Sequence, residues 1–181
     1  TTTQYKTKIQ KLNQPGLLTL WDKILAKKTP GWAPGKAFEF LILRAFELEG
    51  AEIRWPFDVE LFGENVEQID GVIHLDKYNL SVIIESKHYD KNVNIEPIAK
   101  LRNQLQRRPS NAIGSIFSVK EFTAPALILA QFITPQSILL WEKDNIEYCL
   151  KKKFFIEGLI FKYKHAIEEG FPNFDITTIG V

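Results

Sequence analysis

The sequence contains one cysteine, Cys149, so no disulfide can form within the chain. It also lacks a long hydrophobic run, because even the stretch 154–161 is interrupted by Glu157 and Gly158, short of the roughly 18 apolar residues that a membrane helix needs. The first eleven residues are polar and have no apolar core of a secretory signal. These absences predict a protein of the reducing cytoplasm with no membrane partner.

An excess of charge of either sign is also missing, since the 181 residues have a net charge of +1. Bulk electrostatics therefore neither require nor exclude nucleic acid, and a surface that binds phosphate would have to come from local clustering. With 45% hydrophobic residues, the chain is long enough to bury one core. We expect a single domain: an N-terminal helix and loop (1–34), a core that carries the candidate site (35–141) and a C-terminal extension (142–181).

Periodic apolar residues and punctuation by proline and glycine predict a series of helices. The second of them stops at Gly50, a typical C-terminal residue of a helix, and Thr123 is placed to cap the fourth. The expected helices cover 17–28, 36–49, 94–108, 123–132 and 151–169, the last with its lysines on the exposed side.

Strand-like runs fill the remaining segments: 51–62, 68–75, 80–86, 112–119 and 137–141. The first three are separated by the turns 63–65 and 76–79, which predicts an antiparallel meander. The order helix, three strands, helix, strand, helix, strand is typical of an α/β sheet with helices on both faces.

A candidate catalytic group lies on the second and third strands of this meander. Asp70 lies among apolar strand residues, where a carboxylate is costly unless something compensates its charge. Glu85 and Lys87 are two positions apart on one strand and therefore share a face. If these strands pair through the turn at 76–79, Asp70 and Glu85 converge at one end of the hairpin.

Two converging carboxylates beside a lysine suit Mg²⁺, a hard cation that prefers oxygen ligands, with Mn²⁺ as an alternative. Such a site can cleave phosphodiesters, because the metal acidifies a bound water and the lysine positions or deprotonates that water and stabilises developing charge. Each element also has an ordinary structural interpretation: Asp70 and Gly71 can mark a strand bulge, and Glu85-Ser86-Lys87 a solvated strand end.

Three sequence blocks resemble the PD-(D/E)XK nuclease superfamily, in particular its Mrr-like restriction endonuclease branch. Gly35-Lys36-Ala37-Phe38-Glu39 is similar to that branch's opening Gly-X-X-Phe-Glu helix, and Ile69-Asp70-Gly71 with Glu85-Ser86-Lys87 is similar to its catalytic strands. The third block, 114–118 followed by 122–126, resembles its Gly-X-Phe-X-Ser/Thr…Phe-Thr-X-X-Ala segment, with the first aromatic one position later. The resemblance covers roughly residues 21–141.

This resemblance implies a restriction-endonuclease-like αβββαβ core with a mixed sheet, here followed by an additional strand and helix. It implies Mg²⁺ ligation by Asp70, Glu85 and the carbonyl of Ser86, with Lys87 as the catalytic lysine. Glu39 resembles a helix glutamate that assists the metal site in some members. Mrr-like proteins commonly have glutamine where this chain has Glu85, whereas related branches have glutamate.

The helix after the catalytic strand supplies further candidates on its expected polar face. Related nucleases often carry a glutamine there that approaches the site, which assigns this role to Gln104. Lys100, Arg107 and Arg108 are candidates for contact with DNA phosphates, although a solvated face is an equally good interpretation of the arginines. His88 follows Lys87 directly and is either a contact to the scissile strand or a loop residue without a role.

Together, these features predict a metal-dependent DNA endonuclease of restriction, defence or repair. DNA is the expected partner, with a homodimer as an option. A domain that keeps the nuclease fold but binds nucleic acid without turnover is the alternative, disfavoured by the intact acids and lysine, and RNA is a second substrate class. No separate DNA-reading motif is evident, so any specificity must come from loops or a partner.

Overall fold

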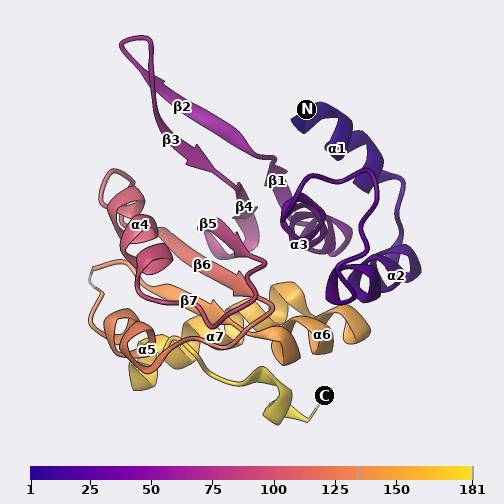
Figure 1. The fold of residues 1–181 in the computed structure, drawn as a ribbon. Coiled ribbons are helices and arrows are strands. Elements are labelled where there is room, and N and C mark those ends of the chain that lie inside the picture. Colours follow the sequence, from indigo (N-terminus) through magenta and orange to yellow (C-terminus); the bar gives the residue numbers. More distant parts are fainter. Residues whose placement is uncertain (134, 181) are drawn as a thin grey trace.

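The computed structural model describes residues 1–133 and 135–180 and has a sheet of five strands between two layers of helices (Figure 1). The strand order is β1-β4-β5-β6-β7, in which β1, β4 and β5 are antiparallel and β5, β6 and β7 are parallel. The predicted mixed α/β sheet flanked by helices is confirmed. The sheet strands are β1 (Glu52–Arg54), β4 (Gly71–Leu75), β5 (Leu80–Lys87), β6 (Ala112–Ser118) and β7 (Ile138–Trp141).

The helices divide between the two faces because alternate strand residues point to opposite sides. One buried cluster, which includes Ile84 and Phe117, packs under α1, α2, α3, α6 and α7, and the other, which includes Ile83 and Ile116, packs under α4 and α5. Their bounds are α1 (Thr2–Gln10), α2 (Gln14–Leu25), α3 (Lys36–Leu48), α4 (Glu96–Leu105), α5 (Ala124–Gln131), α6 (Lys143–Lys152) and α7 (Phe155–Glu169), with short 3-10 helices η1 (Asp76–Tyr78) and η2 (Ile176–Ile179).

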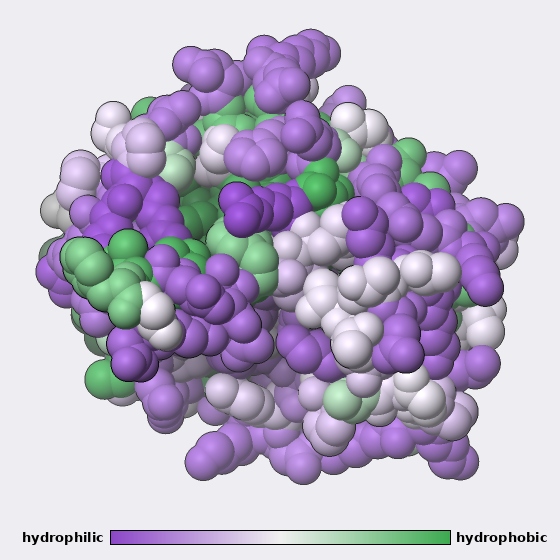
Figure 2. Space-filling model, turned by 90° about the horizontal axis from the view of Figure 1, so that it is seen from above, coloured by the Kyte–Doolittle hydropathy of each residue, from purple (hydrophilic) through white to green (hydrophobic). Residues whose placement is uncertain are grey.

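The prediction of one strand over 51–62 is wrong. The run breaks at Trp55-Pro56, because proline has no N–H for a strand ladder. After the break, β2 (Phe57–Leu61) pairs with β3 (Glu64–Ile69) in a separate hairpin that projects from the sheet (Figure 1). Phe62 at its tip is fully exposed, and much of the surface in Figure 2 is hydrophilic with smaller hydrophobic patches.

Three helix predictions also need correction. Helix α1 falls in a segment that we expected only to be polar, and it begins with a capping box in which Thr1 accepts from the backbone N–H of Gln4. Helix α2 begins at Gln14, before Pro15, because Asn13 caps it and proline is tolerated in a first turn. The expected final helix 151–169 is two helices, separated at Lys153, which has a left-handed backbone.

Other elements agree with the sequence pattern. Helix α3 ends at Leu48, directly before Glu49 and Gly50, and Thr123 accepts a hydrogen bond from Ala126 N–H at the start of α5. The third predicted helix is present as α4, with Pro97 in its first turn. Among the described residues, no helix is both long enough and apolar enough to span a bilayer.

Candidate active site

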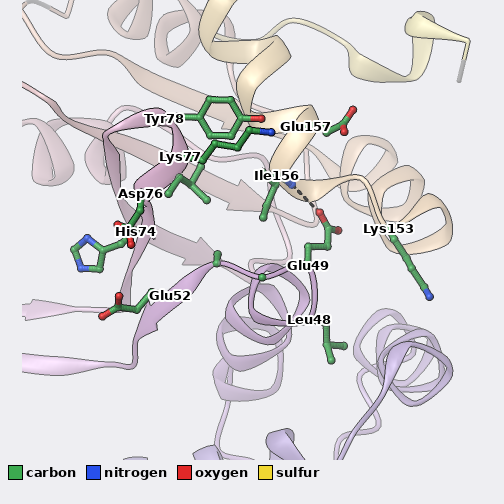
Figure 3. A pocket seen from close by; sticks show the side chains of 13 residues that line it. Leu48, Glu49, Glu52, His74, Asp76, Lys77, Tyr78, Lys153, Ile156 and Glu157 are labelled. Atoms are coloured by element: carbon green, nitrogen blue, oxygen red, sulfur yellow. Dashed lines mark hydrogen bonds between the residues drawn. The ribbon is translucent and has the colours of Figure 1, made fainter.

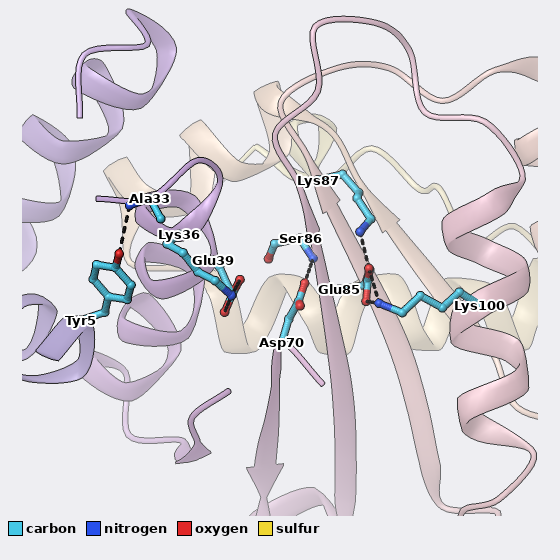
Figure 4. Close-up of polar contacts among 9 residues, drawn as sticks. All are labelled: Tyr5, Ala33, Lys36, Glu39, Asp70, Glu85, Ser86, Lys87 and Lys100. Atoms are coloured by element: carbon cyan, nitrogen blue, oxygen red, sulfur yellow. Dashed lines mark hydrogen bonds and ion pairs between the residues drawn. The ribbon is translucent and has the colours of Figure 1, made fainter. Parts of the chain in front are cut away.

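The register of β4 and β5 determines how Asp70 lies relative to Glu85. Gly71 pairs with Ile84, so one further step along both strands brings Asp70 opposite Glu85. The backbone N–H of Ser86 donates to Asp70 Oδ2 at 2.9 Å, which ties the carboxylate to the neighbouring strand (Figure 4). The two acids therefore meet where the strands separate.

Glu85 is a buried carboxylate whose charge is balanced by two lysines. Its side chain is 1% exposed, and Lys87 Nζ forms an ion pair with Oε1. Lys100 Nζ, from α4, lies 3.0 Å from both Oε1 and Oε2 (Figure 4). A buried carboxylate with no partner would be strongly destabilising, so the two ammonium groups account for its burial.

Glu39 enters the same cluster from the opposite side of Asp70, as Figure 4 shows. It is 6% exposed, and Lys36 Nζ donates to its two oxygens at 2.9 and 2.7 Å. Burial, followed by the nearby charge of Asp70, raises the pKa of Glu39 to about 7. Lys36 was not among the predicted site residues, although a lysine three positions before a helical glutamate is a recognisable pairing signal.

Helix α3 approaches β4 closely because Gly71 has no side chain. A Cβ at Gly71 would lie 2.6 and 2.8 Å from the two Cδ atoms of Leu43, which is closer than carbon atoms pack. Leu43 is one helical turn after Glu39, and Gly71 directly follows Asp70. The close approach of helix and strand thus brings the two carboxylates into electrostatic range.

The cluster shifts the pKa of Asp70 and Lys87 in the same direction for different reasons. Burial raises the pKa of Asp70, and the charge of Glu85 adds to the increase. Burial acts to lower the pKa of Lys87, but the charge and hydrogen bond of Glu85, together with Asp70, outweigh it and raise the pKa. Lys87 therefore carries a positive charge at neutral pH in this arrangement.

Gln104 is buried, contrary to the prediction that it lies on a polar face of α4. It is 4% exposed, and its Nε2 donates to the carbonyl of Gln68 at 3.2 Å, two residues before Asp70. Its buried Oε1 has no hydrogen-bond partner among the described residues. The docking of α4 on the sheet explains the correction, since it covers a face that sequence periodicity assigned to solvent.

The structure shows where the remaining candidates for nucleic-acid contact lie, and their contact with nucleic acid stays a prediction. Arg107 and Arg108 both form ion pairs with buried Glu67 of β3, the second at 2.6 Å. His88 is half-buried with its ring 6.1 Å from that of Phe38, and burial, with the charge of Lys27, lowers its pKa. The structure therefore gives the two arginines a bracing role for the hairpin that the sequence did not show.

The donor chemistry of the cluster fits a hard divalent cation, because its acidic groups offer carboxylate oxygens. Asp70 accepts one hydrogen bond through Oδ2, whereas both oxygens of Glu85 contact lysine nitrogens. Within the described ranges, no three histidine, cysteine or acidic side chains are spaced to hold a metal together. A cation at Glu85 would therefore have to compete with an ammonium group.

A separate pocket of about 550 Å³ lies at the other end of β4 (Figure 3). Its lining includes His74, Asp76 and Glu49, and none of the predicted site residues belongs to it. Glu49 accepts hydrogen bonds from the N–H groups of Phe155 and Ile156 at 2.9 and 2.8 Å, so it caps the start of α7. The pocket is therefore separate from the carboxylate cluster.

Solved structures are similar to parts of this chain at low identity. The protein of unknown function AF1548 has a TM-score of 0.45 and 16% identity, covering 57% of this chain and 56% of that one. Restriction endonuclease FokI has a TM-score of 0.48 and 13% identity, covering 71% of this chain and 27% of that one. Restriction endonuclease MspJI, solved with a 27-mer oligonucleotide, has a TM-score of 0.43 and 19% identity, covering 78% of this chain and 31% of that one. The chain thus spans about half or less of each of these proteins.

No curated protein sequence matches the chain. The model of the Mrr_cat family, described as restriction endonuclease, matches residues 33–150. This range contains α3, Asp70 between β3 and β4, the strand β5 that carries Glu85, and helices α4 and α5. It confirms the resemblance to Mrr-like nucleases drawn from the three sequence blocks. The chain belongs to the Mrr_cat restriction endonuclease family.

Proposed function

We propose that this chain hydrolyses DNA phosphodiesters in the presence of Mg²⁺ or Mn²⁺, in restriction, defence or repair. The observation that supports this most is the meeting of Asp70, Glu85 and Lys87 at one end of paired strands, in a member of a restriction endonuclease family. Glu39 adds a third acid to the same cluster.

The residues that would hold the cation are Asp70 and Glu85, with the carbonyl of Ser86. When bound, a divalent cation supplies a Lewis acid for the phosphate and lowers the pKa of a coordinated water. Asp70 is already fixed in position by the N–H of Ser86. Glu39 lies near enough to Asp70 for their charges to interact, and its pKa of about 7 allows it to accept a proton near neutral pH.

Lys87 is assigned to the reacting phosphate. From its position against Glu85, we infer that Lys87 donates to a phosphate oxygen and stabilises negative charge as water attacks phosphorus. The attacking water passes a proton to Glu39, the phosphorus–oxygen bond to the leaving group breaks, and the leaving oxygen takes up a proton from solvent. We assign Lys87 this role in preference to that of a general base.

Cleavage of supercoiled plasmid, methylated and unmethylated, tests the proposal. We expect nicked or linear product with Mg²⁺ or Mn²⁺, none with EDTA, and a loss of about 10³-fold or more for Asp70→Asn. The matched control is Asp76→Asn, because Asp76 is an exposed aspartate in η1 and should not affect the rate. Retained binding with no cleavage under any metal condition would favour the non-catalytic alternative, and cleavage of RNA alone would change the substrate class.

A further inference from the structure

Lys100 was predicted to contact a DNA phosphate, but its ammonium lies within the carboxylate cluster. It is 3.0 Å from each oxygen of Glu85, a group that is itself 1% exposed. Lys87 forms an ion pair with the same carboxylate through Oε1. Glu85 therefore has a lysine on each side, and Lys100 is the one that comes from outside the strand.

Helix α4 holds Lys100 in this position through contacts along its length. A Cβ at Gly114 of β6 would lie 2.7 Å from Leu101, the neighbour of Lys100, so the helix packs as closely on the sheet as a glycine permits. Further along α4, Gln104 donates to β3, and Arg108, which follows the helix, pairs with Glu67 of the same strand. The packing of the helix thus places Lys100 beside Glu85.

The cluster already contains as many lysines as carboxylates. Three carboxylates lie among three ammonium groups. Lys36 forms an ion pair with Glu39, and Lys87 and Lys100 each form one with Glu85. A divalent cation at two of these carboxylates adds positive charge beside three lysine side chains. The members are Glu39, Asp70, Glu85, Lys36, Lys87 and Lys100.

We propose that Lys100 determines how many divalent cations the site takes and how tightly. Its ammonium occupies the side of Glu85 that a second cation would need, so the site binds one cation, and it binds that cation more weakly than the bare carboxylates would. The inference rests on the proposed function, because it assumes that Asp70 and Glu85 are the metal ligands. The Lys100 ammonium thus takes the place of a second metal ion beside Glu85. It acts on the bound cation through that carboxylate and is therefore a positioning residue.

Calorimetric titration of the whole chain with Mn²⁺, without DNA, tests this inference. Removal of one positive charge within a few ångströms of a divalent ion should strengthen binding about tenfold. We expect Lys100→Met to bind Mn²⁺ about tenfold more tightly than the unmodified chain or to take a second ion. Lys100→Arg, which keeps the charge, should restore the original affinity and stoichiometry. The control is Lys91→Met, since Lys91 is an exposed lysine that is not part of the cluster.

The variants also separate a change at the metal site from a loss of fold. Circular dichroism and thermal unfolding check each protein, and Lys100→Gln, which retains a donor of similar length, replaces Lys100→Met if the latter does not fold. Unchanged Mn²⁺ affinity and stoichiometry in the charge-removing variants would overturn the inference, and so would the absence of Mn²⁺ binding in all variants. Because the titration requires no cleavage, a failed plasmid assay alone refutes only the proposed nuclease activity.

Discussion

Two lysines in different regions of the molecule, one half-buried and one fully buried, have opposite pKa shifts. Lys87 is at the end of β5, where it pairs with Glu85, and its pKa is raised. Lys162, in α7, is fully buried on the other side of the sheet, and its pKa is lowered to about 7. Its Nζ donates to the carbonyl of Phe174 and lies 5.1 Å from the centre of the Trp141 ring.

The difference between them comes from the groups that surround each amine. Burial disfavours the charged form of both. At Lys87 a carboxylate in direct contact outweighs burial, whereas at Lys162 burial dominates over the weaker influences of Cys149, Asp175 and Glu142. A buried lysine therefore indicates reactive chemistry only together with its partners. Lys87 fits a site for an anion, and Lys162 is part of the packing.

The sharpest test of this comparison replaces each lysine by methionine, which has a similar shape but no charge. We expect Lys87→Met to reduce plasmid cleavage by about 10³-fold or more, because it removes stabilisation of the transition state. Lys162→Met should retain the normal rate at a temperature where both variants are folded. Equal losses in both variants would remove the distinction between the two regions.

The second prediction concerns stability, and it applies to Lys162. Between pH 7 and the ordinary lysine pKa of 10.5, the unfolded chain binds a proton that the native amine does not hold. The free energy of unfolding should therefore increase with pH in this window, by up to about 1.4 kcal/mol per unit from this group, and the full penalty is present below pH 7.

Lys162→Met should remove this contribution, so its stability relative to the unmodified chain is greatest near neutral pH and decreases by about 2–3 kcal/mol between pH 7 and 9. Urea unfolding at several pH values measures the difference, in which titration of the other groups largely cancels. Parallel stability curves for the two proteins across this window would show that Lys162 keeps its proton in the fold.

The sequence was sufficient for features that depend on local pattern. Helix α3 follows from its apolar residues and Gly50, and the placement of Glu85 and Lys87 on one strand follows from strand geometry. Pro56 could have shown that the first strand-like run must break. The polar helix α1 gives little periodic signal, because only Ile9 is buried in it.

Features that depend on packing between distant segments could not be predicted. The contact of Lys100 with Glu85 requires the docking of α4 on the sheet, and the same docking buries Gln104. The burial of Lys162 contradicts the expectation that the lysines of this helix are exposed. A lysine normally avoids the interior, and only the tertiary structure shows the carbonyl of Phe174 and the ring of Trp141 that accept its amine.

The smallest expected effect comes from replacing one glycine in each of the two regions, Gly71 beside the carboxylate cluster and Gly158 in α7. Gly71→Ala should cost about 1–2 kcal/mol, because Leu43 is fully buried and cannot move aside freely. It should also reduce cleavage roughly tenfold by moving Glu39 away from Asp70, since small errors of position are costly in catalysis. In Gly158→Ala, the contacts of 3.0 Å with Ile176 and 3.2 Å with Cys149 are offset by better helix propensity, so cleavage stays normal. If Leu43→Val restores part of the activity in the Gly71→Ala variant, the spacing between α3 and β4 causes the loss. Equal losses of activity in Gly71→Ala and Gly158→Ala would instead attribute the effect to general destabilisation.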